Sequence, residues 1–247
     1  MQYNFAMSDS PKDLDRLAER ARVVVREFAE YLRQTAGDRV LGLSVYGAAA
    51  AGTIDLDEQV VHTALVLDAV DLDLLERLAA EGARWDQRRV AAPTVFSPAY
   101  IARSRDTFPL EFIEIQQHHV TVLGEDHFAP LVFDPTHVRL QCERELKVLE
   151  IGLQQGILVS QGRSESLRIL GADVAERLLR ALRGALWLKG TRHALPAAQV
   201  VEVAQRLFDR PFVGIGGALS GSGPTSWRQV RQLHADIQAL GKLVDAL

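Results

Sequence analysis

The sequence predicts an α+β domain followed by a helical bundle, on the basis of three observations. In the first half, short apolar runs rich in β-branched residues alternate with segments whose apolar residues recur at helical spacing. From Thr136 onward, almost every segment has helical spacing, and glycine or proline separates the segments. The chain has 247 residues, 47% of them hydrophobic, so it can bury a full core without a disulfide or a structural metal. We therefore expect residues 1–135 to form a mixed sheet with flanking helices and residues 136–247 to form a four-helix bundle.

The first domain begins with a helix-start pattern. Ser10 can cap a helix, Pro11 suits its first turn, and Asp13 stands where a capping-box acid would. A second helix should run from its cap at Asp71 to Trp85. The other expected elements are strands at residues 39–46, 59–70, 92–98 and 110–122 and a helical turn at residues 99–106.

The second domain should contain four helices, at residues 136–161, 164–189, 196–208 and from Thr225 or Ser226 to the end. A glycine-rich link, Gly214–Gly223, precedes the last helix. The apolar residues of that helix repeat in near-heptad steps: Trp227, Val230, Leu233, Ile237, Leu240, Val244 and Leu247. A seam of this kind is typical of helix–helix interfaces, so a homodimer through this face is one hypothesis.

The composition excludes several classes of protein. Charged residues make up 24% of the chain and the net charge is −4, which gives no strong signal for nucleic-acid binding. The N-terminal residues do not form a signal peptide, and no run approaches the roughly 18 apolar residues of a membrane span. The single cysteine, Cys142, cannot form an internal disulfide and lies in an apolar helical stripe, where we expect inert core. We therefore expect a cytoplasmic protein without membrane contact.

The stretch between Tyr46 and Gly52 is the most informative candidate site. A strand that stops at Gly47, turns through small residues and enters a helix leaves backbone amides free to bind phosphate. This pattern makes Gly47, Ala48 and Gly52 candidate nucleotide-binding residues. An alanine-rich turn is also typical of tight packing, and the residues alone leave both interpretations open.

These residues also carry a resemblance to a known family. The run Val-Tyr-Gly47-Ala48-Ala-Ala-Ala-Gly52, the apolar strand after it and the helical second half resemble the nucleotidyltransferase superfamily of the polymerase-β type. Kanamycin-type and minimal nucleotidyltransferases of bacteria belong to that superfamily. The resemblance implies that the turn holds nucleotide phosphates, with alanine at position 48 where the family has a serine. It also implies an Asp-x-Asp or Asp-x-Glu pair on the next strand that binds two Mg²⁺ ions.

The expected carboxylate pair is missing from that strand. Counting along the chain places Val60 and His62, or His62 and Ala64, at the two positions. Mg²⁺ prefers oxygen ligands, and nucleotidyl transfer depends on it to neutralise charge on the phosphates. We therefore expect a catalytically inactive member, without a cofactor, whose cleft (His62 included) keeps nucleotide or small-anion binding for a regulatory role.

Two alternatives remain open. In the first, Asp55 and Asp57 bind Mg²⁺ and the protein transfers a nucleoside monophosphate to a small hydroxyl acceptor; their polar surroundings favour a solvated loop instead. In the second, the protein is an interaction module that acts through the last helix.

Four further residues are of types that bind metals or act in catalysis. Glu111 and Glu114 should face opposite sides of a strand, and the neighbours His118 and His119 should do the same. We therefore expect neither pair to form a site. His62 itself, within an apolar strand, is expected to be buried.

Overall fold

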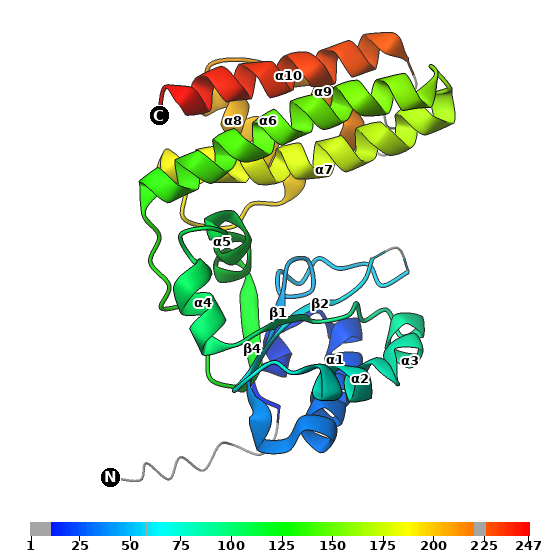
Figure 1. Ribbon diagram of the computed structural model, residues 1–247, viewed down its shortest axis with the longest axis vertical. Coiled ribbons are helices and arrows are strands. Elements are labelled where there is room, and N and C mark those ends of the chain that lie inside the picture. The colour runs from blue at the N-terminus through cyan, green and yellow to red at the C-terminus, as the bar shows by residue number, and fades with distance from the viewer. Residues whose placement is uncertain (1–10, 58, 220–225) are drawn as a thin grey trace. The chain divides into compact units, whose positions relative to one another are not determined.

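The computed structural model describes residues 11–57, 59–219 and 226–247 (Figure 1). The chain divides into two compact units, residues 1–105 with 111–132 and residues 106–110 with 133–247. The predicted cap at Ser10, the predicted helix start at Thr225 and the end of the predicted link Gly214–Gly223 lie outside the described residues.

A mixed sheet of four strands forms the centre of the first unit, as predicted. The strands are β1 (Val40–Tyr46), β2 (His62–Leu67), β3 (Thr94–Phe96) and β4 (His119–Gly124). Their order is β3-β2-β1-β4, with β1 antiparallel to both β2 and β4 and β2 parallel to β3. The sheet therefore brings the end of β1 beside the beginnings of β2 and β4.

Helix α1 (Glu19–Ala36) covers one face of the sheet. Its buried residues Val25, Phe28 and Leu32 belong to the same core as Leu43 and Leu65 of the sheet. The helix begins later than predicted. A short 3-10 turn, η1 (Leu14–Arg16), precedes it, and the backbone amide of Lys12 donates to Val122 O of β4 at 2.8 Å. The residues around Lys12 are thus held against the sheet instead of starting the helix.

The helix predicted from Asp71 to Trp85 is two helices, α2 (Leu72–Ala79) and α3 (Gly82–Gln87). The predicted cap is confirmed, because Asp71 Oδ1 accepts a hydrogen bond from Leu74 N at 2.8 Å. The break precedes Gly82, a residue that weakens a helix interior.

The strand predicted at residues 110–122 is wrong in its first part. Residues there form helix α5 (Pro109–Gln117), and only β4 is extended; helix α4 (Pro98–Ser104) precedes them. Proline suits the first turn of a helix, and burial of Leu110, Phe112 and Ile113 supplies the packing. Because residues three apart lie on one helix face, Glu111 and Glu114 share a face, contrary to our expectation.

The second unit is helical, as predicted. Its long helices are α6 (Pro135–Ser160), α7 (Ser164–Leu188), α8 (Ala197–Leu207) and α10 (Trp227–Asp245). Ser226 caps α10 in a capping box with Gln229. Cys142 is fully buried, and burial raises the pKa of its thiol to about 12, so the thiol is unreactive as expected. Among the described helices, none is long and apolar enough to cross a membrane.

The near-heptad seam of α10 is part of the core of the second unit. Leu233, Ile237, Leu240 and Val244 are each at most 1% exposed. Helix α10 packs on α6, α7 and the short helix α9 (Val213–Gly217) of the same chain. These four residues are therefore unavailable to a second copy or a partner. Trp227 and Leu247, at the two ends of the seam, are 47% and 39% exposed, and a homodimer through this helix stays a prediction.

Helix α9 occupies the start of the predicted glycine-rich link. Asp236 of α10 accepts hydrogen bonds from Gly214 N at 2.7 Å and Ile215 N at 2.9 Å. Burial raises the pKa of Asp236, although these amides and Arg210 act in the opposite direction. The Asp236 carboxylate therefore occupies the free backbone amides at the N-terminus of α9.

Candidate functional site

Three side chains form a row at the end of the sheet where β1 stops. His62 on β2 is opposite Tyr46, and Tyr46 is opposite His119 on β4. Directly paired residues in antiparallel strands point to the same face, so the three side chains share one face. It is the face opposite α1, because the neighbouring Val45 belongs to the core under α1. The rings of Tyr46 and His62 are 5.8 Å apart.

The same face continues with small and polar residues. Ser44, two positions before Tyr46, is paired with Ala64 and Thr121. The hydroxyl groups of Ser44 and Thr121 are 2.9 Å apart and form a buried hydrogen bond. At the two positions where the resemblance implies carboxylates, this face thus has the exposed imidazole of His62 and the methyl group of Ala64.

His62 was expected to be buried, and that prediction is wrong. The strand begins at His62 instead of at Gln59, so His62 lies at the open end of the sheet. The residues on either side in the chain, Val61 and Thr63, point to the opposite face and are buried.

The turn after β1 differs from the prediction in one respect. No helix starts there: the chain makes a single turn, with Ala51 N donating to Gly47 O and Thr53 N to Ala48 O, both at 3.0 Å. Gly47 and Gly52 have φ values of 72° and 73°, which favour glycine. Gly47 N also donates to His118 O at 3.1 Å, which ties the turn to the start of β4.

The alanines of this turn are consistent with both interpretations of the sequence, tight packing and phosphate binding. Ala49 is 1% exposed and belongs to the core, as the packing interpretation requires. Within the described part of the chain, however, the amides of Ala48, Ala49 and Ala50 donate to no acceptor. Ala48 and Ala50 are only half-buried, so the turn presents backbone donors that an anion can use.

The acidic alternative, Asp55 and Asp57, lies on a loop before β2. Asp57 is paired with Arg20 at 3.0 Å, and its side chain is 76% exposed. Asp55 Oδ1 accepts a hydrogen bond from Asp57 N at 3.0 Å, which closes a local turn. In the described ranges, no cluster of three or more histidine, cysteine or acidic residues could hold a metal ion.

A polar cavity of about 540 Å³ lies beside the turn. Ala50 of the turn, His118 and His119 at the start of β4, and Lys12 and Arg16 of the N-terminal segment line it. Two acidic residues, Asp13 and Asp126, also contribute to its wall. Lys12 and Arg16 therefore face two acids, Asp13 and Asp126, and the Asp126 carboxylate is hydrogen-bonded to His119.

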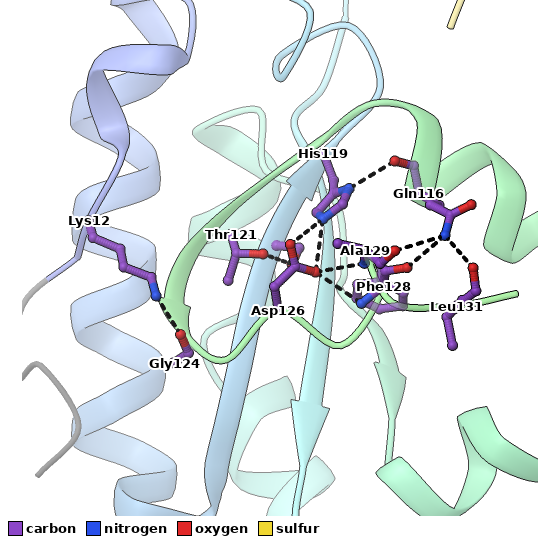
Figure 2. A network of polar contacts seen from close by, with 10 residues as sticks. Lys12, Gln116, His119, Thr121, Gly124, Asp126, Phe128, Ala129 and Leu131 are labelled. Atoms are coloured by element: carbon purple, nitrogen blue, oxygen red, sulfur yellow. Dashed lines mark hydrogen bonds and ion pairs between the residues drawn. The ribbon is translucent and has the colours of Figure 1, made fainter. Parts of the chain in front are cut away.

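The pair of His119 and Asp126 forms the centre of a hydrogen-bond network (Figure 2). Nε2 of His119 lies 2.9 Å and 3.0 Å from the two carboxylate oxygens, and Nδ1 lies 3.2 Å from Gln116 O. Asp126 Oδ1 also accepts from Phe128 N and Ala129 N, both at 3.0 Å. Burial alone would raise the pKa of Asp126, but the bonds from Ala129, His119 and Phe128 lower it below its ordinary value.

This network positions a loop and is not arranged for proton transfer. Both ring nitrogens of His119 face oxygen acceptors, so the imidazolium form donates two hydrogen bonds and a neutral ring donates one. Neither nitrogen is free to act as a general base. The Gln116 side chain adds bonds from Nε2 to the carbonyls of Phe128, Ala129 and Leu131 at 3.1, 3.2 and 2.7 Å, which hold the same loop (Figure 2).

Our sequence reasoning did not identify Lys12, Arg16 or Asp126 as part of a site. In the sequence, His119 is a candidate only for metal ligation, and no site is expected there. The signal available was the short distance in sequence between His119 and Asp126 across Gly124, whose φ of 66° marks a turn. Such a turn brings flanking side chains together.

The comparisons with known proteins establish the fold. No protein-family model and no curated protein matches the chain. Among solved structures, the chain is similar to a spectinomycin adenyltransferase, AAD(9), from Enterococcus faecialis, whose crystal structure contains ATP and spectinomycin. The match has a TM-score of 0.61 and 10% sequence identity, and covers 90% of this chain and 98% of that chain. The predicted nucleotidyltransferase-like fold is therefore confirmed.

Proposed function

We propose that this chain is a nucleotidyltransferase-fold protein of the cytoplasm that binds a nucleotide, or another phosphate-bearing anion, without transferring a nucleotidyl group. One observation carries the proposal: the exposed start of β2 carries His62, with the buried Ala64 behind it, where the family has carboxylates, while the adjoining turn and cavity present amides and cations. The site thus keeps groups that attract phosphate and lacks those that seat Mg²⁺.

The chemistry of the donor set supports binding over catalysis. Nucleotidyl transfer requires divalent cations to neutralise the phosphates and activate the attacking hydroxyl. An imidazole is a poor ligand for Mg²⁺ and a methyl group is none, so His62 and Ala64 cannot replace two carboxylates. Lys12 and Arg16 are basic side chains that can pair with phosphate without a metal, although the Lys12 ammonium group also donates to Gly124 O at 2.7 Å.

The ligand that we propose is a nucleoside triphosphate. The similar adenyltransferase was crystallised with ATP, and the amides of Ala48 and Ala50 and the side chains of Lys12 and Arg16 offer donors for a polyphosphate. Binding without turnover suits a regulatory role, in which the bound nucleotide changes the protein's interaction with another molecule.

Calorimetry with ATP tests this proposal. We expect ATP to bind equally with excess Mg²⁺ and with EDTA, and we expect no pyrophosphate release when spectinomycin is added as an acceptor. Arg16→Gln should weaken ATP binding about tenfold, or about 1.4 kcal/mol, because it removes a charge-assisted contact. Arg26→Gln, on the exposed side of α1, is the matched control and should leave the affinity unchanged.

The active alternative gives the opposite results. If Asp55 and Asp57 seat Mg²⁺, the chain will release pyrophosphate from ATP in a reaction that EDTA stops, and the double substitution to asparagine will abolish it. That outcome would overturn the proposal. Absence of ATP binding under both conditions would also overturn it.

A further inference from the structure

Helix α6 carries an apolar stripe on the side that faces away from the core of the second unit. Its buried residues, among them Cys142, Leu149 and Leu153, form the inner face of the helix. The outer face has seven exposed residues, which we call the outer stripe: Leu140, Arg144, Val148, Ile151, Gln155, Leu158 and Val159. A contiguous apolar stripe on an exposed helix face marks an interaction site.

The outer stripe has enough apolar surface for a specific contact. Leu158 and Val159 are 78% and 74% exposed, and Leu140, Val148 and Ile151 are 57%, 48% and 56% exposed. Together these five side chains expose on the order of 500 Å², as much as the largest patches of monomeric proteins. Two such stripes packed on each other would bury roughly 1,000 Å², the lower limit for a specific interface.

The spacing of the outer stripe fits another helix. From Arg144 to Leu158 its residues recur in steps of four, three, four and three, which are the a and d positions of a heptad. Side chains at these positions fit between the side chains of a second helix that lies alongside. The occupant that this face fits is therefore a long helix with a matching stripe.

The order of residues along the outer stripe matches a second copy of α6 that runs antiparallel. With a two-fold axis at the middle of the stripe, Val148 is opposite Ile151 of the other copy. In the same register, Leu140 is opposite Val159. Each apolar residue of these two pairs thus meets an apolar residue.

The two polar residues of the outer stripe favour the same orientation. In the antiparallel register Arg144 is opposite Gln155, whose side-chain oxygen can accept a hydrogen bond from the guanidinium group. The two copies of Arg144 are then roughly 16 Å apart along the helices, because each residue adds 1.5 Å. In a parallel pair, Arg144 would instead be opposite Arg144, and the like charges would repel each other.

We propose that the protein forms a homodimer in which the outer stripes of two α6 helices pack against each other in antiparallel orientation. Each copy contributes the same surface, so the contact closes after two chains. The outer stripe is distinct from the seam of α10. It belongs to the second unit and the candidate nucleotide site to the first, so the dimer and nucleotide binding can be tested, and can fail, separately.

Sedimentation equilibrium of the full chain tests the dimer. We expect a monomer at low concentration and a dimer with a Kd on the order of 10 µM, as suits a small interface. Ile151→Glu should raise this Kd at least tenfold, because it places a charge in the apolar contact. Ile169→Glu on α7 is the matched control, since Ile169 is 58% exposed, and it should change the Kd less than twofold.

Disulfide formation tests the orientation. Cys142 is buried and its thiol is unreactive, so an introduced cysteine is the one that oxidises. A mixture of Leu140→Cys chains and Val159→Cys chains should form a linked dimer, because opposed positions of packed helices are close enough for a disulfide. Either variant alone should form none, since equal positions lie roughly 28 Å apart along an antiparallel pair.

Three results would each overturn the proposal. A chain that stays monomeric up to about 1 mM would leave the outer stripe to a different partner. Equal effects of Ile151→Glu and Ile169→Glu would place the dimer contact elsewhere. A disulfide formed by Leu140→Cys alone would show a parallel pair.

Discussion

Replacing Asp126 by alanine should release the loop that forms one wall of the polar cavity. The substitution removes one acceptor shared by Phe128 N, Ala129 N and the His119 ring. Each such bond contributes about 0.5–1.5 kcal/mol net, and bonds to a charged acceptor are at the upper end. The Asp126 side chain is 39% exposed, so solvent screening reduces the sum, and we expect a loss of about 2 kcal/mol.

Urea unfolding followed by circular dichroism measures this loss directly. Asp126→Asn keeps an oxygen acceptor for the two amides but loses the charge that faces His119, so we expect about half of the effect. Glu125→Gln, at the exposed neighbouring position, is the control and should stay within about 0.5 kcal/mol of the wild type. If Asp126→Ala is as stable as Glu125→Gln, the network does not hold the loop.

Three further predictions concern stability. Because the pKa of Asp126 is lowered in the folded state, the stability that its charge contributes is present above about pH 4 and is lost as the pH falls through the lowered pKa. The difference between wild type and Asp126→Ala in urea unfolding should therefore shrink on acidification, and a difference that grows would contradict this. Asp236→Ala leaves two buried amides of α9 without an acceptor and should cost about 3 kcal/mol in the same assay, with Asp245→Ala at the exposed end of α10 as its control. Leu240→Asp should unfold the second unit, as near-ultraviolet circular dichroism would show, because Leu240 is fully buried; a folded protein of smaller mass in light scattering would contradict this and indicate a homodimer through α10.

The predictions from sequence succeeded where one local pattern determines the structure. The helices of the second unit have long apolar periodicity, and the predicted cap at Asp71 forms its hydrogen bond. The fold class followed from the alternation of such patterns. No long-range contact was needed for these inferences.

The predictions failed where long-range packing determines the outcome. The residues of α5 have enough β-branched and apolar character to resemble a strand, and burial around Phe112 favours the helix instead. The periodicity of α10 reveals an apolar seam but not whether the partner helix belongs to the same chain. The cavity beside Ala50 depends on Lys12, which reaches β4 through contacts between residues far apart in sequence.

The binding assignments at Gly47, Ala48, Gly52 and His62 stay predictions. The structure places these residues at the same end of the sheet, and the described contacts do not include a ligand. What the sequence could not supply was the position of His119, because its neighbour on β1, Tyr46, is distant in the chain.

The way in which the two edge strands of the sheet, β4 and β3, are protected has a consequence for aggregation. At one border, Lys12 engages two carbonyls of β4, Val122 O through its amide and Gly124 O at 2.7 Å through its ammonium group. At the other, β3 spans only Thr94–Phe96, and Pro93 and Pro98 flank it. Edge strands with free N–H and C=O groups can pair with strands of other molecules and so cause aggregation. Prolines beside an edge strand, or hydrogen bonds that already occupy its carbonyls, prevent this pairing. Both edges of the sheet are thus protected against pairing with strands of other molecules. Removal of the segment before η1 would expose β4 to such pairing.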